Sequence, residues 1–140
     1  MMTALEFLKR PTKVEKRMNA ALRKVELYKS LTERITVSFG RVTVSRTRDM
    51  TANETTVIKL MEAEDKVTEL KAEYMALVDE TTHLLNLLKE EYGEVILFQK
   101  YLKHMSNRDI CKFIHLGHSQ VTIHHDAAMK ELDCMLQRME

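Results

Sequence analysis

Few residues in this chain can make sharp turns or break a helix. Three glycines and one proline among 140 residues are too few for an all-β or loop-rich fold. Tryptophan is absent, and aromatic residues make up only 6% of the chain. Leu, Met, Glu, Lys and Ala, which favour helices, are common. The composition therefore predicts an all-α protein.

Long apolar runs and a cysteine framework are also missing. No stretch is apolar for long enough to act as a signal peptide or to cross a bilayer, so we expect a cytoplasmic protein with no membrane partner. The two cysteines, Cys111 and Cys134, fall on predicted helices. We expect both to be reduced thiols that act as small apolar side chains.

The net charge of +1 conceals a separation of charge along the chain. Residues 1–52 contain 12 Lys/Arg and 5 Asp/Glu, residues 53–92 contain 4 and 10, and residues 93–140 contain 6 of each. Two helices of opposite charge that lie side by side neutralise each other, and we favour this interpretation. A basic surface for nucleic acid is the alternative.

Two heptad patterns predict a long helical hairpin. Thr3 and Glu6 form a capping box for a short first helix, which Pro11 is expected to end. A basic helix follows over residues 12–35, with apolar residues at alternating spacings of four and three. The same spacing marks an acidic helix over residues 53–92, which we expect to fold back antiparallel like a coiled coil.

The segment between the two helices, residues 36–52, breaks the heptad pattern with a glycine and β-branched residues. We predict a long solvated loop. The alternative is a basic arm that contacts phosphates through its three arginines. These are Arg41, Arg46 and Arg48.

The hairpin, residues 1–92, is expected to be one domain and to form a homodimer. The longer helix should overhang the shorter one. Its unpaired end, together with Leu5, Phe7 and Leu8, leaves apolar surface that a second copy of the chain could cover.

Residues 93–140 are expected to form a second small domain that contains a helix-turn-helix. Ser106 can cap a short helix with Asp109 at its third position. Gly117 permits a turn, after which a second helix starts at His118 or Ser119. The inner face of the first helix is expected to carry Ile110 and Ile114, and that of the second Val121, His125, Ala128, Met129 and Leu132. Two helices at a steep angle leave the start of the second one exposed, and this is how the motif reaches base edges in a major groove. Many corners between two helices satisfy the pattern without touching DNA, so a purely structural corner is the alternative.

Polar and basic side chains surround the predicted motif. Those at the exposed start of the second helix are His118, Ser119, Gln120 and Thr122. The basic residues around the motif, the candidate phosphate contacts, are Lys100, Lys103, Arg108 and Lys112. Gln120 can pair with adenine, although this part of the helix lacks the Arg and Lys that most often contact guanine, and Asp126 follows.

The motif resembles the promoter-reading domain, region 4, of bacterial sigma factors. The residues that carry the resemblance are Ser106, Ile110, Cys111, Ile114, His115, Leu116, Val121, His125, Ala128 and Met129. His115 stands where the motif prefers glycine, so some strain in the turn is expected, with Gly117 taking part of the bend. His124 stands where an apolar residue is usual.

The order of segments in the whole chain is similar to that of ArpU/RinA-type regulators of late transcription in phages and prophages of Gram-positive bacteria. The shared features are an N-terminal L-x-F-L-x-R-P sequence, a basic heptad helix, a variable loop, a long acidic heptad helix and the C-terminal motif. The resemblance implies a regulator that binds double-stranded DNA, activates late genes and acts through host RNA polymerase.

Other classes of function find less support in the sequence. Cys111 and His115 are four apart, as two metal ligands on one helical face would be, but no C-x-x-C or H-x-x-x-H unit completes a tetrahedral zinc site, so no metal or cofactor is expected. The chain has no glycine-rich phosphate loop and no nucleophile elbow, so we expect no enzyme and no small-molecule substrate. The main alternative is a non-catalytic module that docks on host RNA polymerase or on another phage or mobile-element factor.

Overall fold

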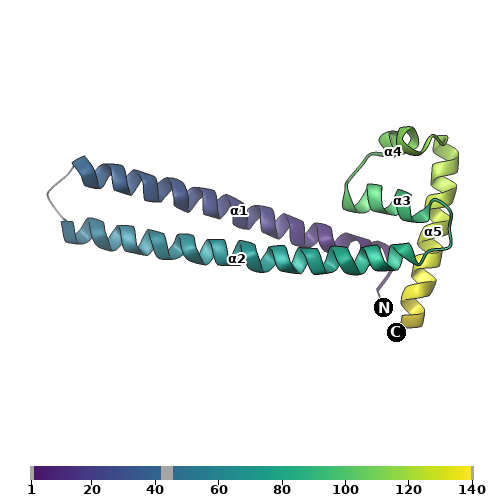
Figure 1. The fold of residues 1–140 in the computed structure, drawn as a ribbon, viewed down its shortest axis with the longest axis horizontal. Helices are drawn as coiled ribbons and strands as arrows, with labels where there is room; N and C mark the ends of the chain where they lie inside the picture. Colours follow the sequence, from purple (N-terminus) through teal and green to yellow (C-terminus); the bar gives the residue numbers. More distant parts are fainter. Residues whose placement is uncertain (1, 42–45, 140) are drawn as a thin grey trace. The chain divides into compact units, whose positions relative to one another are not determined.

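The computed structural model describes residues 2–41 and 46–139, with side chains outside 35–53. The elements are α1 (Ala4–Arg41), α2 (Arg46–Asn86), α3 (Gly93–Leu97), the π-helical turn η1 (Phe98–Leu102), α4 (Asn107–Ile114) and α5 (His118–Met139) (Figure 1). No strand occurs in the described ranges, which confirms the all-α prediction. No helix within these ranges is both long enough and apolar enough to pass through a membrane.

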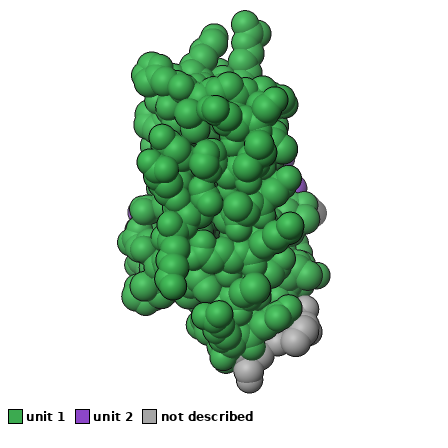
Figure 2. Space-filling model, turned by 90° about the vertical axis from the view of Figure 1, so that its right-hand side faces the viewer, with its two compact units in different colours: residues 1–13, 74–140 green, residues 14–73 purple. Residues whose placement is uncertain are grey.

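The chain forms two compact units, which Figure 2 colours separately. One unit consists of residues 1–13 and 74–140, and the other of residues 14–73. Both long helices pass from one unit into the other. This grouping differs from the domain boundary expected after residue 92. That residues 1–92 and 93–140 fold as separate domains stays a prediction.

The unit of residues 14–73 is an antiparallel pair of helical segments, as the heptad patterns predict. Arg17 of α1 lies beside Glu73 of α2, with a guanidinium nitrogen 3.3 Å from a carboxylate oxygen. Further along the pair, Tyr28 and Lys59 line one groove. The buried residues of the seam are Val14, Ala21, Val25 and Leu70. All four belong to the predicted heptad stripes.

The first helix starts where it was predicted to start, but the prediction that it ends at Pro11 is wrong. The Glu6 N–H donates to Thr3 Oγ1 at 3.2 Å and the Thr3 N–H donates to Glu6 Oε2 at 3.3 Å, so the capping box forms. Pro11 does not end the helix, because α1 continues through it to Arg41. Proline inside a helix costs about 3 kcal/mol. Here the Pro11 ring is fully buried in the core, and its packing offsets that cost.

The predicted long loop over residues 36–52 is also wrong. Helix α1 runs to Arg41 and α2 begins at Arg46, so every residue of this segment that the structure describes is helical, and residues 42–45 lie outside the described part. Glycine and β-branched residues lower helix propensity, but extending an existing helix is far easier than starting one. Arg41, Arg46 and Arg48 therefore occupy the ends of helices, and the position of their side chains lies outside the described part of the structure.

In the other unit, α5 covers the first turns of α1. The core contains nine buried apolar residues from α1, α2, α3 and α5: Ala4, Phe7, Leu8, Leu84, Leu85, Leu97, Ala128, Leu132 and Leu136. Asp133 of α5 also accepts the free Ala4 N–H at 2.6 Å, which caps the start of α1.

The apolar N-terminal surface expected to recruit a second copy is therefore absent. Phe7 and Leu8 are buried, and only Leu5 is exposed. The predicted overhang is wrong as well, because α1 and α2 have 38 and 41 residues. Local sequence patterns could not predict that α5 packs here, since the contact joins residues more than 100 positions apart.

Candidate nucleic-acid interface

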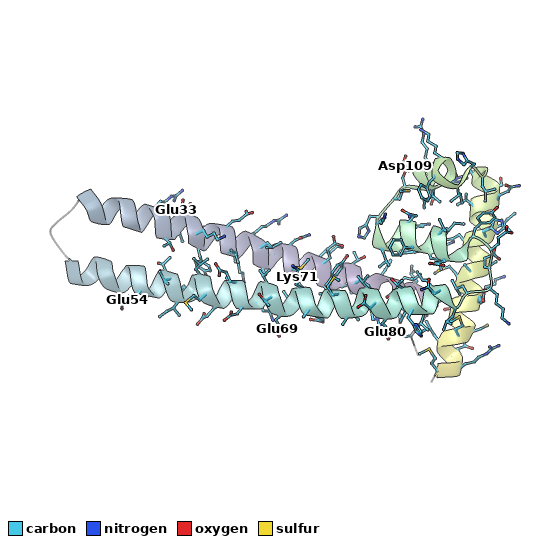
Figure 3. All side chains as sticks on the ribbon, viewed as in Figure 1. Glu33, Glu54, Glu69, Lys71, Glu80 and Asp109 are labelled. Atoms are coloured by element: carbon cyan, nitrogen blue, oxygen red, sulfur yellow. The ribbon has the colours of Figure 1, made fainter. Side chains whose placement is uncertain are left out.

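The predicted cap and inner face of the first motif helix are confirmed. Ser106 has an extended backbone, and its Oγ accepts the Asp109 N–H at 3.2 Å. Asp109 lies in the first turn of α4 (Figure 3). Ile110 on this helix is fully buried, where it packs with Ile96 of α3 and Val121 of α5. The rim of this small core consists of Tyr92, Met105, Cys111, Ile114 and Leu116. Helix α4 is thereby held against α3 and α5.

The turn between α4 and α5 is made by His115 and not by Gly117. His115 adopts the left-handed conformation, with φ 59° and ψ 38°, and the Leu116 N–H donates to the Cys111 carbonyl at 3.2 Å. A residue with a Cβ is strained here, as expected from the sequence. Gly117 has no positive φ, and a Cβ added to it would meet no atom within 4 Å. The prediction that Gly117 supplies the bend is therefore wrong.

The middle of α5 is held very close to the start of α3. A Cβ added to Gly93 would lie 3.0 Å from the Cβ of Ala128 and 3.0 Å from the Cβ of Glu90. Gly93 is thus needed for a close approach between helices and not for an unusual backbone angle.

Polar side chains of α5 also hold the chain that joins α2 to α3. The carboxylate of Glu131 accepts the backbone N–H groups of Lys89 and Glu90, at 2.5 and 3.2 Å. The His124 ring pairs through Nδ1 with the Glu90 carboxylate and packs edge-on against the Tyr92 ring, with centroids 4.8 Å apart. His124 is therefore half-buried in a polar clamp, a role that sequence reasoning missed because Glu90 lies 34 residues away.

A chain of three polar groups links η1 to α5 near the exposed start of α5. The Tyr101 hydroxyl lies 2.9 Å from His125 Nε2, and His125 Nδ1 lies 3.0 Å from Asp126 Oδ1. Burial, and then the nearby Asp126 charge, raise the pKa of Tyr101, so the phenol keeps its proton. It can donate to Nε2, which leaves the Nδ1–H to donate to Asp126. His125 faces inward, as the sequence predicts.

The residues predicted to contact DNA lie at the surface. His118, Ser119, Gln120 and Thr122 are all exposed on the first turns of α5. Lys103, Arg108 and Lys112 are exposed and Lys100 is half-buried. None of these four basic side chains forms an ion pair with a described residue. The ammonium groups of Lys100 and Lys103 lie 5.7 and 5.8 Å from the ring centres of Tyr101 and Phe98. The positions of all eight residues agree with a role in binding DNA.

Two large apolar side chains at the motif surface were missed. Phe113 on α4 is 57% exposed, and Ile123 on α5 is 65% exposed. Both are apolar residues that lie outside the predicted inner faces of the two helices. This departure from the helical pattern could have indicated that they are exposed. Isolated exposed apolar residues are common on protein surfaces, so Phe113 and Ile123 indicate a binding surface only if a partner covers them.

The cysteines and histidines do not form a metal site in the part of the chain described. Cys111 is half-buried at the edge of the motif core, and Cys134 is exposed on α5. No group of three His, Cys, Asp or Glu side chains in these ranges is placed to hold a metal ion.

The geometry thus assembles a corner of two helices with polar groups along one exposed helix start and basic groups on the elements beside it. The motif core and the polar contacts of α5 fix how the two helices meet. Comparison with family models, curated proteins and solved structures found no match to this chain.

Proposed function

We propose that the protein is a DNA-binding transcriptional regulator that reads duplex DNA with α4 and α5. The observation that supports this most is the tight turn at His115, which joins a capped α4 to an α5 whose first turns are exposed and polar. A helix presented in this way can enter a major groove, while the helix before it crosses the phosphate backbone. In keeping with the resemblance described above, the proposed role is activation of late genes in a phage or prophage.

The side chains on this surface suit a division between base and phosphate contacts. The Gln120 amide can form two hydrogen bonds to an adenine. Ser119 and Thr122 can contact phosphate or a thymine methyl group, and His118 can do either. The exposed cations Arg108 and Lys112 lie four residues apart on α4 and therefore on one side of it, where both can contact phosphates.

The proposal includes a homodimer that binds a two-fold symmetric site and contacts host RNA polymerase. A dimer would place its two α5 helices in major grooves about 34 Å apart, one turn of DNA. The predicted operator is then a pair of inverted half-sites.

The test is binding of the purified full chain to DNA that carries its own gene region, titrated against salt and nonspecific competitor. Gln120→Ala is expected to weaken selective binding by about 1–3 kcal/mol and to leave nonspecific binding unchanged. Lys112→Ala should weaken binding to all sequences and reduce the slope of log K against log salt by about one.

Two matched variants serve as controls. Gln137→Ala and Lys130→Ala change the same residue types at exposed positions further along α5, and neither should alter binding. Equal affinity of the wild-type chain for its own DNA and for competitor DNA would refute direct readout.

A second candidate function is a module that docks on a protein, for example host RNA polymerase. The exposed Phe113 and Ile123, and the lack of Arg and Lys over residues 118–122, favour it. Under this alternative, Phe113→Ala and Ile123→Ala should weaken binding to purified bacterial RNA polymerase and leave DNA affinity unchanged. Loss of DNA binding without loss of polymerase binding would argue for the regulator instead.

A further inference from the structure

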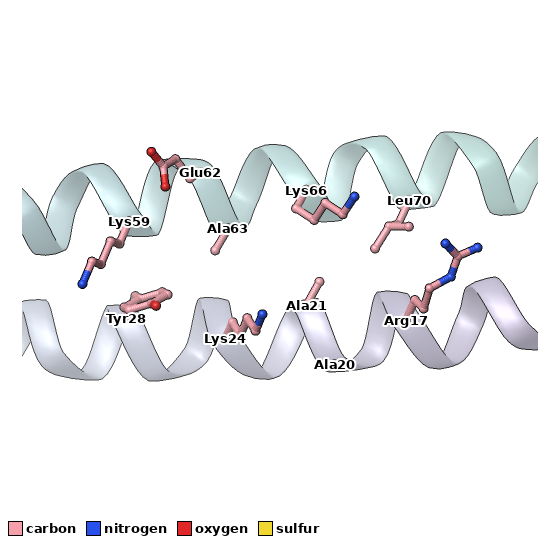
Figure 4. Close-up of a pocket in the computed structure, with 10 residues that line it drawn as sticks. All are labelled: Arg17, Ala20, Ala21, Lys24, Tyr28, Lys59, Glu62, Ala63, Lys66 and Leu70. Atoms are coloured by element: carbon pink, nitrogen blue, oxygen red, sulfur yellow. The ribbon is translucent and has the colours of Figure 1, made fainter.

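The unit of residues 14–73 contains a groove between α1 and α2 that the two helices do not fill. Its volume is about 490 Å³. Small side chains, Ala21 and Ala63, face the groove from the two helices, and Tyr28 and Leu70 complete its apolar floor (Figure 4). A seam built on alanine leaves room for a further helix to approach closely.

The rim of this groove is positively charged. Four cations, Arg17, Lys24, Lys59 and Lys66, and one anion, Glu62, line it. Arg17 and Lys66 have ion pairs at 3.3 and 3.8 Å, whereas Lys24 and Lys59 form none with a described residue. Like charges on opposite walls repel each other, so the hairpin alone does not account for these lysines.

The groove suits an acidic helix better than a nucleic acid. A helix can fill the apolar floor with its own apolar side chains while its carboxylates meet the lysines on the rim. A phosphate backbone would satisfy the lysines but leave the half-buried Tyr28 and Ala63 in contact with water.

A second copy of the chain provides such a helix. Within this unit, residues 14–34 of α1 carry six Lys/Arg and three Asp/Glu, and residues 54–73 of α2 carry three and six. The excess charges are equal and opposite, so a two-fold pairing of α1 with the partner's α2 is self-complementary.

The spacing of the charges fits the same pairing. Arg17 and Lys24 are seven residues apart on α1, and so are the exposed Glu62 and Glu69 on α2. Seven residues rise about 10 Å along a helix, so both pairs can align whichever way the helices run. Arg17 is paired with Glu73 and Glu69 with Lys66 within one copy, and both ion pairs are exposed. Exchanging these pairs for pairs with a second copy therefore costs little free energy.

We propose that this groove is the interface of a two-fold dimer, in which α2 of each copy lies in the groove of the other. Glu62 and Glu69 of one copy face Arg17 and Lys24 of its partner. The contact also covers Leu27, which is 53% exposed and lies one turn beyond Lys24 on α1. The dimer is the one expected within the proposed function, but its formation does not require DNA, so a test on protein alone separates the two proposals.

The experiment is sedimentation equilibrium of the full chain and of two charge-reversal variants, Lys24→Glu and Glu62→Lys. Each variant alone places like charges across the interface, and its dimer dissociation constant should rise at least about tenfold. Mixing the two variants should restore the dimer as a heterodimer, which native mass spectrometry identifies when one variant is uniformly labelled with 15N, because the unlabelled variants have almost the same mass. High salt should weaken the wild-type dimer.

Two controls separate this interface from general charge effects. Arg23→Glu and Glu64→Lys make the same charge changes at exposed neighbouring positions and should leave the dimer intact. Helicity by circular dichroism checks folding, and Lys24→Glu should retain it because the new carboxylate can pair with Lys59 or Lys66.

Three outcomes would overturn the proposal. The wild-type chain remains a monomer at low salt and high protein concentration, or both variants dimerise as the wild type does, or the mixture fails to form the heterodimer. Weaker DNA binding by Lys24→Glu with an unchanged dimer would assign the groove to phosphates instead.

Discussion

The left-handed conformation of His115 leads to a prediction that runs against the usual effect of glycine. Replacing a residue by glycine normally destabilises a protein, because the unfolded chain gains freedom. His115 has φ 59°, where a residue with a Cβ costs about 1–2 kcal/mol more than in a right-handed helix. Its side chain is exposed, so little packing is lost. We expect His115→Gly to stabilise the motif by about 1 kcal/mol, the remainder after the entropy cost of glycine.

Hydrogen exchange measured by mass spectrometry is the appropriate assay, because a chain with two units need not unfold in one step. Amides of α4 and α5 that exchange through opening of the motif should slow about fivefold in His115→Gly, since 1.4 kcal/mol is a factor of ten. Amides in the unit of residues 14–73 serve as an internal reference and should not change.

Gly117→Ala is the matched variant. Gly117 has no positive φ and its Cβ position is open, so alanine should fit. Alanine stiffens the unfolded chain, which stabilises the fold, but it is a poorer residue than glycine just before the start of α5. The two effects nearly cancel, and we expect the free energy of unfolding to change by less than about 0.5 kcal/mol. Faster exchange in His115→Gly, together with strong destabilisation by Gly117→Ala, would show that the turn lies at Gly117 and would refute the reasoning.

Three further predictions concern the contacts that hold α5. Alanine usually favours a helix over glycine, but the Cβ of Gly93→Ala would meet Ala128, so we expect a loss of about 1 kcal/mol in the free energy of unfolding, measured by denaturant titration. Adding Ala128→Gly removes that clash, so the double variant should be more stable than the sum of the two single effects. Glu131→Ala removes the acceptor for two backbone N–H groups and should cost about 1–3 kcal/mol by the same measurement, whereas an effect near zero would mean that water replaces the carboxylate fully. The raised pKa of Tyr101 means that the folded state holds the phenol proton more tightly than the unfolded state. The stability that this tighter binding contributes is complete below about pH 10, the ordinary pKa of tyrosine, and is lost as the pH rises through the folded pKa. Tyr101→Phe should therefore lose less stability than the wild type between neutral pH and pH 11, and an identical alkaline loss would contradict the assignment.

Local patterns were enough to predict much of the fold. The heptad stripes of the hairpin, the capping box at Thr3 and the cap at Ser106 all depend on residues within a few turns of each other, and all three are confirmed. The errors at Pro11 and over residues 36–52 have one physical cause. Both predictions took residues of low helix propensity as helix ends, although packing and helix extension can outweigh propensity.

Helix periodicity correctly placed residues inside or at the surface of the motif, but it could not find contacts between segments far apart in the sequence. Periodicity places Ile110 and Val121 inside the motif and leaves Gln120 at the surface, as the structure has them. The pairing of His124 with Glu90 could not be found in this way, because it joins segments 34 residues apart. The opposite charges of the two long helices were read as mutual neutralisation, but their facing lysines at the groove leave part of that positive charge unpaired.

Helix α5 combines a firmly held body with an exposed start. Among residues 118–122 only Val121 is buried, whereas the contacts through His124, Ala128, Glu131 and Asp133 all lie further along the helix. Substitutions at the exposed start should therefore change binding with little effect on stability. Substitutions at the held part should change stability first, and binding only through the orientation of α5. A variant of Gln120 that loses DNA affinity at full stability, beside a variant of Glu131 that loses both, would separate contact from orientation in the proposed regulator.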